Sequence, residues 1–253
     1  MKKTDFLSLF LVKKPIIGMI HLKGTTPENV LERAKGEIDL MMSNGIDAVL
    51  IENYFGNLSD VENVLKWIGK QRSHLLYGVN LLSSTMPEPL TFSLASYYGA
   101  KFIQIDSVAG RLPTTPVNKD EEFNQKLKSL RENFSIPIIG GVRFKYQPVN
   151  SGRNEEEDLQ IGIERCDAIA VTGEGTGIET DLQKIQAFRE VIGDFPLVIA
   201  AGLTAENCLS QMEIGDACIV GSYFKNSYQA DGEVSVDHIQ RFVEKIQILR
   251  NNP

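Results

Sequence analysis

Pro196-Leu-Val-Ile-Ala-Ala-Gly202 is a continuous apolar run that ends in glycine. Two runs of the same kind flank it: Ala168-Ile-Ala-Val-Thr-Gly173 comes before it and Ala217-Cys-Ile-Val-Gly-Ser222 after it. Parallel strands that are covered on both faces show continuous rather than alternating hydrophobicity. Three such strands, each ending in glycine or small hydroxyl residues, are typical of the last part of a phosphate-binding (β/α)8 barrel, in which the loops after strands 7 and 8 often hold a phosphate.

The rest of the chain alternates predicted strands and helices with little spare length, which favours a barrel or an open doubly wound sheet. Five strand patterns precede the three above, at residues 15–22, 47–52, 75–82, 102–107 and 136–144. Helix patterns cover 27–43, 59–71, 121–133 and 236–249, and further helices are expected after Pro87, Asn154 and Asp181. Because (β/α)8 barrels reach 253 residues as one domain, we expect residues 1–253 to form a single α/β domain of the TIM-barrel class.

Composition and charge narrow the function classes. The net charge of −7 argues against a non-specific nucleic-acid binder, since such proteins neutralise backbone phosphates with a basic surface. Cys166, Cys208 and Cys218 are odd in number and unclustered, so they indicate neither a disulfide framework nor a zinc site. A cytoplasmic location follows as the expectation. A homo-oligomer is expected only because such barrels often form one.

The N-terminal run Phe6-Leu-Ser-Leu-Phe-Leu-Val12 is apolar but far shorter than the roughly 20 residues of a membrane span. No small-residue cleavage site follows it, so a signal peptide is not expected either. We interpret the run as a short helix that closes the bottom of the barrel. A membrane-surface anchor is the alternative, given the neighbouring lysines.

Chemistry in such a barrel takes place where the strands end and the βα loops begin. Glu52 ends an apolar strand, where an ionised carboxylate needs a partner or a chemical role. Lys145 follows the fifth strand and can act as a base or bind a phosphate. The predicted catalytic residues are Glu52, Lys145, Asp106 and His21, with Asp106 and His21 orienting the substrate or its acid step.

The glycine-rich strand ends predict an anion site, because glycine lets backbone N–H groups approach a ligand closely. Thr204 is a plausible N-cap of the helix after Gly202, with Asn207 near the third helical position. The loop from Gly173 to Gly177 has neither the P-loop nor the dinucleotide spacing, and we expect a mobile cover over the barrel mouth. The predicted substrate and phosphate ligands are Asn80, Thr172, Gly173, Thr176, Gly177, Gly202, Gly221, Ser222 and Lys225.

Several of these segments together resemble the BtpA/SgcQ family. The resemblance rests on Lys14-Pro-Ile-Ile-Gly-Met-Ile-His-Leu22, Gly78-Val-Asn80, the segment 168–173 with Thr176, Gly177 and Asp181, Gly202 with Glu206 and Asn207, and Ile219-Val-Gly-Ser222 with Lys225. It runs from about residue 13 to residue 245 and implies a TIM barrel. Family names refer to photosystem I biogenesis and to a carbohydrate gene cluster, and the family has no well-established reaction.

The sequence departs from the family pattern near the expected mouth. Ser83-Ser84-Thr85 replaces an Asn-Asp pair, Tyr146 replaces a usual histidine, and Asp106 stands where asparagine is common. These changes indicate either a different substrate from that of typical members or a loss of catalysis.

Two function classes follow. The first is an enzyme acting on a small phosphorylated metabolite, a sugar phosphate or nucleotide-like compound, by isomerase, epimerase or lyase chemistry. The second is a non-catalytic assembly or regulatory factor for a membrane or photosystem-type complex. The sequence leaves the cofactor unidentified. A divalent metal held by His21, Glu52 and Asp106 is an alternative that no spacing motif supports, so no metal is predicted.

Overall fold

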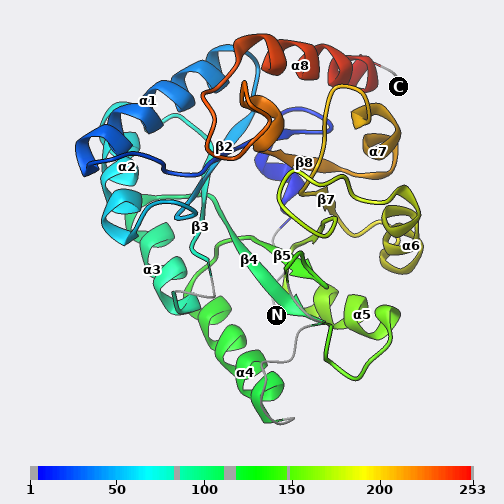
Figure 1. Ribbon diagram of the computed structural model, residues 1–253. Helices are drawn as coiled ribbons and strands as arrows, with labels where there is room; N and C mark the ends of the chain where they lie inside the picture. Colours follow the sequence, from blue (N-terminus) through cyan, green and yellow to red (C-terminus); the bar gives the residue numbers. More distant parts are fainter. Residues whose placement is uncertain (1–4, 83–85, 111–117, 147–148, 252–253) are drawn as a thin grey trace.

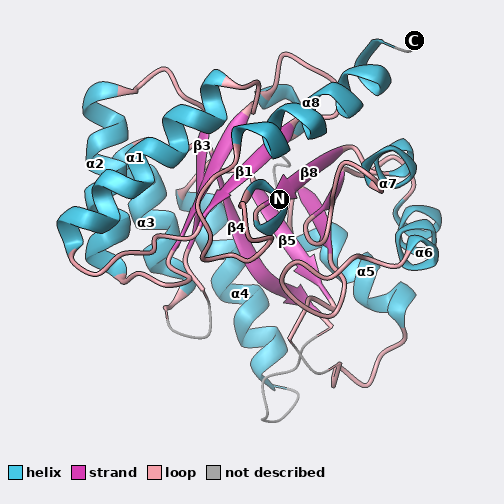
Figure 2. Ribbon diagram, turned by 45° about the horizontal axis from the view of Figure 1, so that its top comes forward, coloured by secondary structure: helices cyan, strands magenta, loops and turns pink. Residues whose placement is uncertain are grey.

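The computed structural model describes residues 5–82, 86–110, 118–146 and 149–251, so the Ser83-Ser84-Thr85 stretch lies outside the described residues. In these segments parallel strands close into a barrel in sequence order, and helices surround it (Figure 1, Figure 2). The strands are β1 Ile16–Ile20, β2 Ala48–Glu52, β3 Tyr77–Asn80, β4 Phe102–Ala109, β5 Ile138–Val142, β6 Ala168–Val171, β7 Leu197–Ile199 and β8 Ala217–Val220. The helices are α1 Pro27–Ser43, α2 Leu58–Gln71, α3 Glu88–Tyr98, α4 Asn118–Asn133, α5 Glu155–Arg165, α6 Leu182–Ile192, α7 Cys208–Ile214 and α8 Val236–Asn251, with 3-10 turns η1 Leu7–Leu9 and η2 Ser222–Phe224. The predicted TIM barrel is confirmed.

The strands are apolar throughout because both of their faces are buried. Successive side chains of a strand point to opposite faces, so each strand supplies residues to two apolar layers. Ile17, Leu50 and Phe102 belong to the cluster inside the barrel. Ile16 and Ile51 belong to the larger cluster that includes the surrounding helices. This double burial is the reason why the strands read as unbroken hydrophobic runs.

Local signals in the sequence explain where several helices begin. Pro27 occupies the first turn of α1, and the Thr26 hydroxyl accepts a hydrogen bond from the backbone N–H of Asn29 at 3.2 Å. Asn57 and Asn154 form capping boxes at the starts of α2 and α5. Such caps satisfy N–H groups that the first turn leaves without helical partners.

Strand β5 ends at Val142, two residues before the predicted end at Phe144. Arg143 has a φ of 46°, in the left-handed region that non-glycine residues rarely adopt. The strand geometry therefore stops at Arg143, and the chain turns toward Lys145 at the barrel mouth.

The opposite end of the barrel is closed by the N-terminal segment. The short predicted helix is the 3-10 turn η1, and Phe6 just before it is fully buried. The Phe6 ring packs edge to face against Phe102 inside the barrel, with the ring centroids 5.9 Å apart. Among the described residues, no helix combines the length and hydrophobicity needed to span a membrane.

Candidate active site

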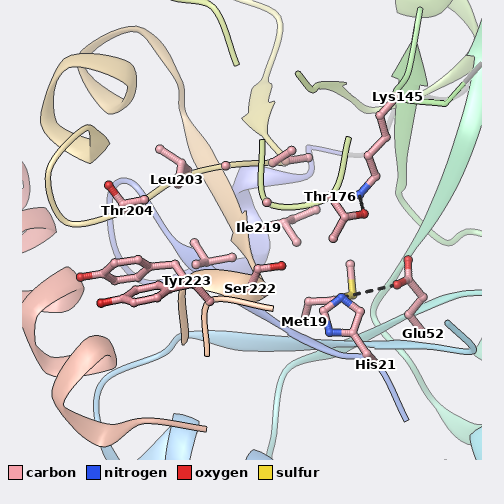
Figure 3. A pocket seen from close by; sticks show the side chains of 17 residues that line it. Met19, His21, Glu52, Lys145, Thr176, Leu203, Thr204, Ile219, Ser222 and Tyr223 are labelled. Carbon is pink, nitrogen blue, oxygen red and sulfur yellow. Dashed lines mark hydrogen bonds and ion pairs between the residues drawn. The ribbon is translucent and has the colours of Figure 1, made fainter. Parts of the chain in front are cut away.

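A pocket opens at the end of the barrel where the carboxyl ends of the strands meet (Figure 3). Side chains from β1, β2 and the β5 and β6 loops form one side of it, and the loops after β7 and β8 form the other. It is lined by Met19, His21, Glu52, Lys145, Thr176, Gly177, residues 200–204, residues 219–223 and Tyr228. The predicted site residues in this wall are His21, Glu52, Lys145, Thr176, Gly177, Gly202, Gly221 and Ser222.

Glu52 is the last residue of β2, and its side chain is buried in the pocket wall. The Asn80 amide donates a hydrogen bond to Glu52 Oε1 at 2.7 Å, and His21 Nε2 lies 3.8 Å from Glu52 Oε2. Burial and then the negative charge of Asp106 raise the pKa of Glu52 to about 7, against the opposing effect of Lys145. A carboxyl group with this pKa can both accept and donate a proton near neutral pH.

Asn80 and Asp106 lie beside Glu52 and are not among the residues that line the pocket. The fully buried Asn80 donates through Nδ2 to both Glu52 Oε1 and Asp106 Oδ1, the latter at 3.1 Å. Gln104 Nε2 also donates to Asp106 Oδ1, at 2.8 Å. Two amide groups thus hold the carboxylates in place. The Asn80 amide holds the Glu52 carboxyl group, and the charge of Asp106 raises the pKa of Glu52.

His21, just after β1, presents a neutral imidazole to the pocket. Burial is the main cause that lowers the pKa of His21 to about 3, and the positive charges of Lys225, Lys145 and Arg33 add to it. Among the described residues, His21 Nδ1 is buried without a hydrogen-bond partner. A Cβ at Gly221 would lie 2.8 Å from His21 Cε1, so only glycine fits against this ring. A neutral imidazole can polarise a substrate oxygen without carrying a full charge.

Lys145 contacts the loop that follows β6. Its Nζ donates to the Thr176 hydroxyl at 3.1 Å, and its backbone N–H donates to the Thr172 hydroxyl at 2.9 Å. The Tyr146 hydroxyl accepts a hydrogen bond from the backbone N–H of Thr176 at 2.7 Å. The Gly173–Gly177 loop therefore reaches across to the end of β5, and its Thr176 and Gly177 line the pocket. Thr172 itself is buried and supports Lys145 rather than lining the pocket.

Gly202 and Gly173 are required by a close backbone approach. Gly202 has a φ of 68°, and a Cβ there would lie 2.2 Å from the carbonyl oxygen of Ile178. A Cβ at Gly173 would lie 2.6 Å from the carbonyl oxygen of Glu179. The two glycines thus let the chain around Glu179 pack against the ends of β6 and β7. Gly202 lines the pocket, whereas Gly173 serves this packing and does not.

Thr204 and Asn207 cap a turn that precedes α7. The Asn207 side chain accepts a hydrogen bond from the Thr204 backbone N–H at 2.8 Å, and the Thr204 hydroxyl accepts one from the Asn207 N–H at 3.4 Å. Helix α7 begins only at Cys208, later than a cap at Thr204 predicts. The reciprocal bonds hold the 202–204 backbone in the pocket wall.

Lys225, a predicted phosphate ligand, does not line the pocket. Lys225 follows the 3-10 turn η2 and is only 1% exposed. Its Nζ lies 2.7 Å from Glu37 Oε2 on α1, and Glu37 Oε1 accepts a hydrogen bond from Arg33 Nε at 2.9 Å. The Lys225 ammonium is therefore neutralised inside the protein, where it anchors the loop after β8.

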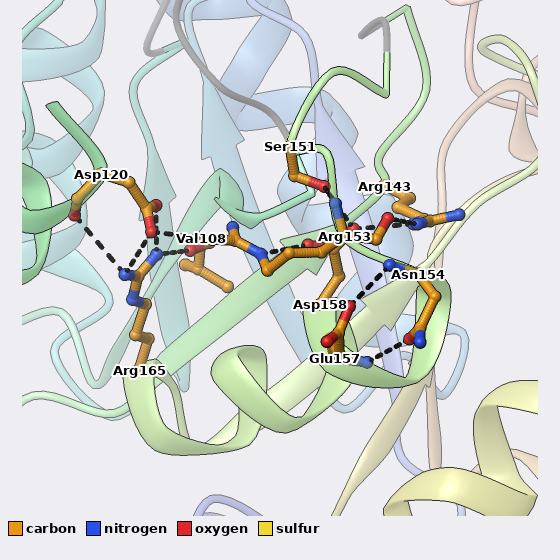
Figure 4. Close-up of polar contacts among 9 residues, drawn as sticks. All are labelled: Val108, Asp120, Arg143, Ser151, Arg153, Asn154, Glu157, Asp158 and Arg165. Carbon is orange, nitrogen blue, oxygen red and sulfur yellow. Dashed lines mark hydrogen bonds and ion pairs between the residues drawn. The ribbon is translucent and has the colours of Figure 1, made fainter. Parts of the chain in front are cut away.

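A second cluster of charged side chains, rich in arginine, joins neighbouring elements of the barrel (Figure 4). Asp158 is fully buried, and its two carboxylate oxygens each accept a hydrogen bond at 2.9 Å, from Arg143 Nε and Arg153 Nε. Asp120 joins Arg153 to Arg165 through ion pairs at 3.2 and 2.8 Å. Buried charges need such pairing, and these groups connect α4, β5 and α5 instead of facing the pocket.

Sequence reasoning missed three residues in or beside the site. Gln104 lies two residues before Asp106 in β4, so strand alternation places it on the same face and could have identified it. Tyr223 and Tyr228 line the pocket from η2 and the loop after it. A loop has no regular alternation of buried and exposed residues, so no pattern in the sequence could have placed Tyr228 at the pocket.

Within residues 5–82, 86–110, 118–146 and 149–251, no group of three or more His, Cys, Asp or Glu side chains is arranged to hold a metal ion. The alternative of a metal on His21, Glu52 and Asp106 therefore has no geometric support. Between the two carboxylates lies a hydrogen-bond donor, the Asn80 amide.

A comparison with solved structures finds the same fold in other proteins. Phosphoribosyl anthranilate isomerase from Thermus thermophilus superposes with a TM-score of 0.60 at 14% sequence identity, covering 93% of this chain and 100% of that one. At this identity the likeness shows the fold alone.

Sequence comparisons give closer relatives. An uncharacterised protein of Thermococcus kodakarensis is 28% identical, with 95% of this chain and 98% of that protein covered. The photosystem I biogenesis protein BtpA of Synechocystis is 23% identical, with 98% and 94% covered. The sequence pattern that defines the BtpA family matches residues 12–248. This match spans most of the chain, which therefore belongs to the BtpA family.

Proposed function

We propose that the protein is an enzyme that acts on a small phosphorylated metabolite by acid–base chemistry. The observation that carries the proposal is the placement of Glu52. This buried carboxyl group has a pKa raised to about 7, and it shares a pocket with the loops after β7 and β8. Perturbed acids in concave sites are typical of catalytic groups.

The phosphate is held by the loops after β7 and β8. Gly202 and Gly221 expose backbone to the pocket, and Ser222 adds a hydroxyl group. This is the place where many (β/α)8 barrels bind phosphate. Phosphoribosyl anthranilate isomerase, whose name describes a phosphorylated substrate, shares the fold.

The reaction is an isomerisation, epimerisation or elimination that begins with proton removal. Glu52 takes a proton from a carbon next to a substrate carbonyl, and the electron pair of the broken C–H bond moves toward the carbonyl oxygen. His21 as a neutral imidazole and Lys145 lie in the same pocket wall, where they stabilise the developing negative charge. In an isomerisation Glu52 then returns the proton to the neighbouring carbon. In an epimerisation the same carbon is reprotonated from its opposite face, and in an elimination the electron pair expels a leaving group from the adjacent carbon, with the proton going to that group.

Thermal unfolding against inorganic phosphate, a panel of sugar phosphates and nucleotides tests the proposal. A ligand that binds the native state raises the unfolding midpoint by mass action. We expect at least one phosphorylated compound to raise it, Ser222→Asp to abolish the shift by charge repulsion, and Glu52→Gln to keep the shift while losing turnover of that compound. If no phosphorylated compound raises the midpoint, the proposal is wrong.

A non-catalytic assembly factor is the second candidate, favoured by the name of the relative that is called a photosystem I biogenesis protein. The two candidates differ in the role of Glu52. If the protein is an assembly factor, the wild-type protein binds ligands in the pocket without converting them to products, and Glu52→Gln behaves in the same way.

A further inference from the structure

Two aromatic rings, Tyr223 and Tyr228, line one end of the pocket, and the His238 ring stacks on both. The Tyr228 ring stacks on His238 with centroids 4.6 Å apart and planes 16° apart, and Tyr223 stacks on the same imidazole at 5.4 Å. Tyr223 is buried, whereas Tyr228 is 54% exposed, and both line the pocket. Figure 3 shows Tyr223 and Glu52 at opposite ends of the pocket, with Ser222 between them.

The exposed ring of Tyr228 is held in a defined position. Tyr228 has a φ of 56°, which is strained for an aromatic residue and occurs where the surrounding structure imposes it. Its backbone N–H donates to the Lys225 carbonyl at 3.0 Å, and Lys225 is anchored by the buried ion pair with Glu37. On the far side of the loop, Lys23 pairs with Asp231 at 2.7 Å. The ring is thus presented before any ligand arrives, which lowers the entropy cost of stacking.

The His238 ring is also fixed. Its Nδ1 lies 2.9 Å from the Tyr223 carbonyl oxygen and 3.1 Å from that of Lys225. One face of Tyr228 is therefore supported by a side chain that cannot turn freely. An aromatic ring that is backed on one side and half exposed is a suitable platform for a planar group of a ligand.

We propose that the ligand is a nucleotide in which the phosphate links a nucleoside to the reacting group. The base stacks against Tyr228, the phosphate lies at the Gly202 and Ser222 loops, and the reacting group lies at Glu52. This arrangement follows the order of the groups along the pocket, in which the loops with Gly202 and Ser222 lie between the aromatic rings and the Glu52 carboxyl group. The inference rests on the proposed function, because it uses the same phosphate loops and the same acid–base group.

Two matched pairs of probes test it: adenosine diphosphate ribose against ribose 5-phosphate, and uridine diphosphate glucose against glucose 1-phosphate. Within each pair the sugar and its own phosphate are the same, and the nucleotide adds a nucleoside together with a second phosphate group. The Tyr228→Asn variant separates the contribution of the base from that of the added phosphate. We expect the nucleotide of at least one pair to bind the wild-type protein roughly tenfold or more tightly than its sugar phosphate, the scale of one stacked base. Titration calorimetry gives the dissociation constants.

Tyr228→Asn is the diagnostic variant, because asparagine tolerates a left-handed backbone and removes the ring. We expect it to abolish the nucleotide preference and to leave sugar phosphate binding unchanged, which also shows that the variant is folded. Tyr97→Asn is the matched control, since Tyr97 is 81% exposed on α3 and does not line the pocket. This control retains the wild-type preference.

The outcomes separate the two proposals. If sugar phosphates bind as well as their nucleotides, or if the preference survives Tyr228→Asn, the aromatic subsite is wrong while the phosphate-binding enzyme stands. If neither nucleotides nor sugar phosphates bind, both proposals are wrong.

Discussion

The groups around Glu52 set its pKa. Burial disfavours the carboxylate, the negative charge of Asp106 adds to the effect, and Lys145 and the Asn80 hydrogen bond oppose it. The strand that carries Glu52 explains its burial. The residues that set the balance come from three other strands or strand ends, so the side chain acquires its pKa only in the folded barrel.

This balance predicts the pH dependence of stability. The pKa of Glu52 rises from the ordinary 4.5 to about 7 on folding, so between these values the folded state binds more protons than the unfolded state. Stability from this group is therefore present at low pH and is lost as pH rises through 7. Glutamine cannot ionise, so Glu52→Gln does not lose stability in this way as the pH rises. The difference in free energy of unfolding between Glu52→Gln and wild type is therefore expected to shift in favour of the variant by up to roughly 3 kcal/mol from pH 4.5 to pH 8.

Urea unfolding at several pH values measures this difference. Glu132→Gln is the control, because it removes an exposed carboxyl group on α4. Parallel pH profiles for Glu52→Gln and wild type would show that the carboxyl group has an ordinary pKa.

At the scale of elements, the loop after β8 depends on α1. Lys225 is 1% exposed and pairs with Glu37, which also pairs with Arg33. Arg33 in turn donates to the Asp231 carbonyl at 3.0 Å. One helix near the start of the chain thereby positions a loop near its end, and with it the aromatic end of the pocket.

Lys225→Met is expected to lower the free energy of unfolding by about 3 kcal/mol, because it leaves the Glu37 carboxylate buried without its closest cation. The double variant Lys225→Met with Glu37→Gln is expected to recover part of this loss. Arg241→Ala is the control. Its pair with Asp237 on α8 is more than 60% exposed on both sides and contributes within about 0.5 kcal/mol.

Chemical denaturation of the wild type, Lys225→Met, Glu37→Gln and the double variant gives the coupling energy between Lys225 and Glu37. If Lys225→Met is no less stable than the Arg241→Ala control, this ion pair does not anchor the loop.

At the scale of the whole molecule, the two ends of the barrel are different. The N-terminal segment fills one end with Phe6, which packs against Phe10 and Phe102. The other end is open and polar, and four of the five non-glycine residues with positive φ among those described lie there: Leu22, Arg143, Tyr146 and Tyr228. Strained backbone of this kind often gathers at binding sites.

Phe6→Ala is expected to destabilise the barrel by about 3–5 kcal/mol, the usual cost of emptying a buried aromatic site. Leu11→Ala in the same segment is the control, because Leu11 is fully exposed, and it is expected to change stability by less than about 0.5 kcal/mol. Thermal and urea unfolding compare the two. If Phe6→Ala costs no more than Leu11→Ala, the N-terminal segment does not close the barrel.

The amino-acid sequence by itself determined the barrel and the alternation of its strands and helices, and some of their ends. Hydrophobic runs, prolines and caps act over a few residues, so β2 ending at Glu52 and α1 starting at Pro27 could be read directly. The sequence also indicated that Glu52, His21 and Lys145 would meet, because parallel strands in a barrel bring their carboxyl ends to one mouth.

Only the tertiary structure decided what each polar residue contacts. Lys225 follows a glycine-rich strand like a phosphate ligand, but its side chain points to Glu37 on α1, a partner that no local pattern reveals. Asn80 likewise donates to two carboxylates from neighbouring strands. Tyr228 reaches the pocket through a loop without periodicity. Burial patterns are local properties of a sequence, whereas ion pairs, pKa values and loop paths depend on groups that become neighbours only when the chain is folded.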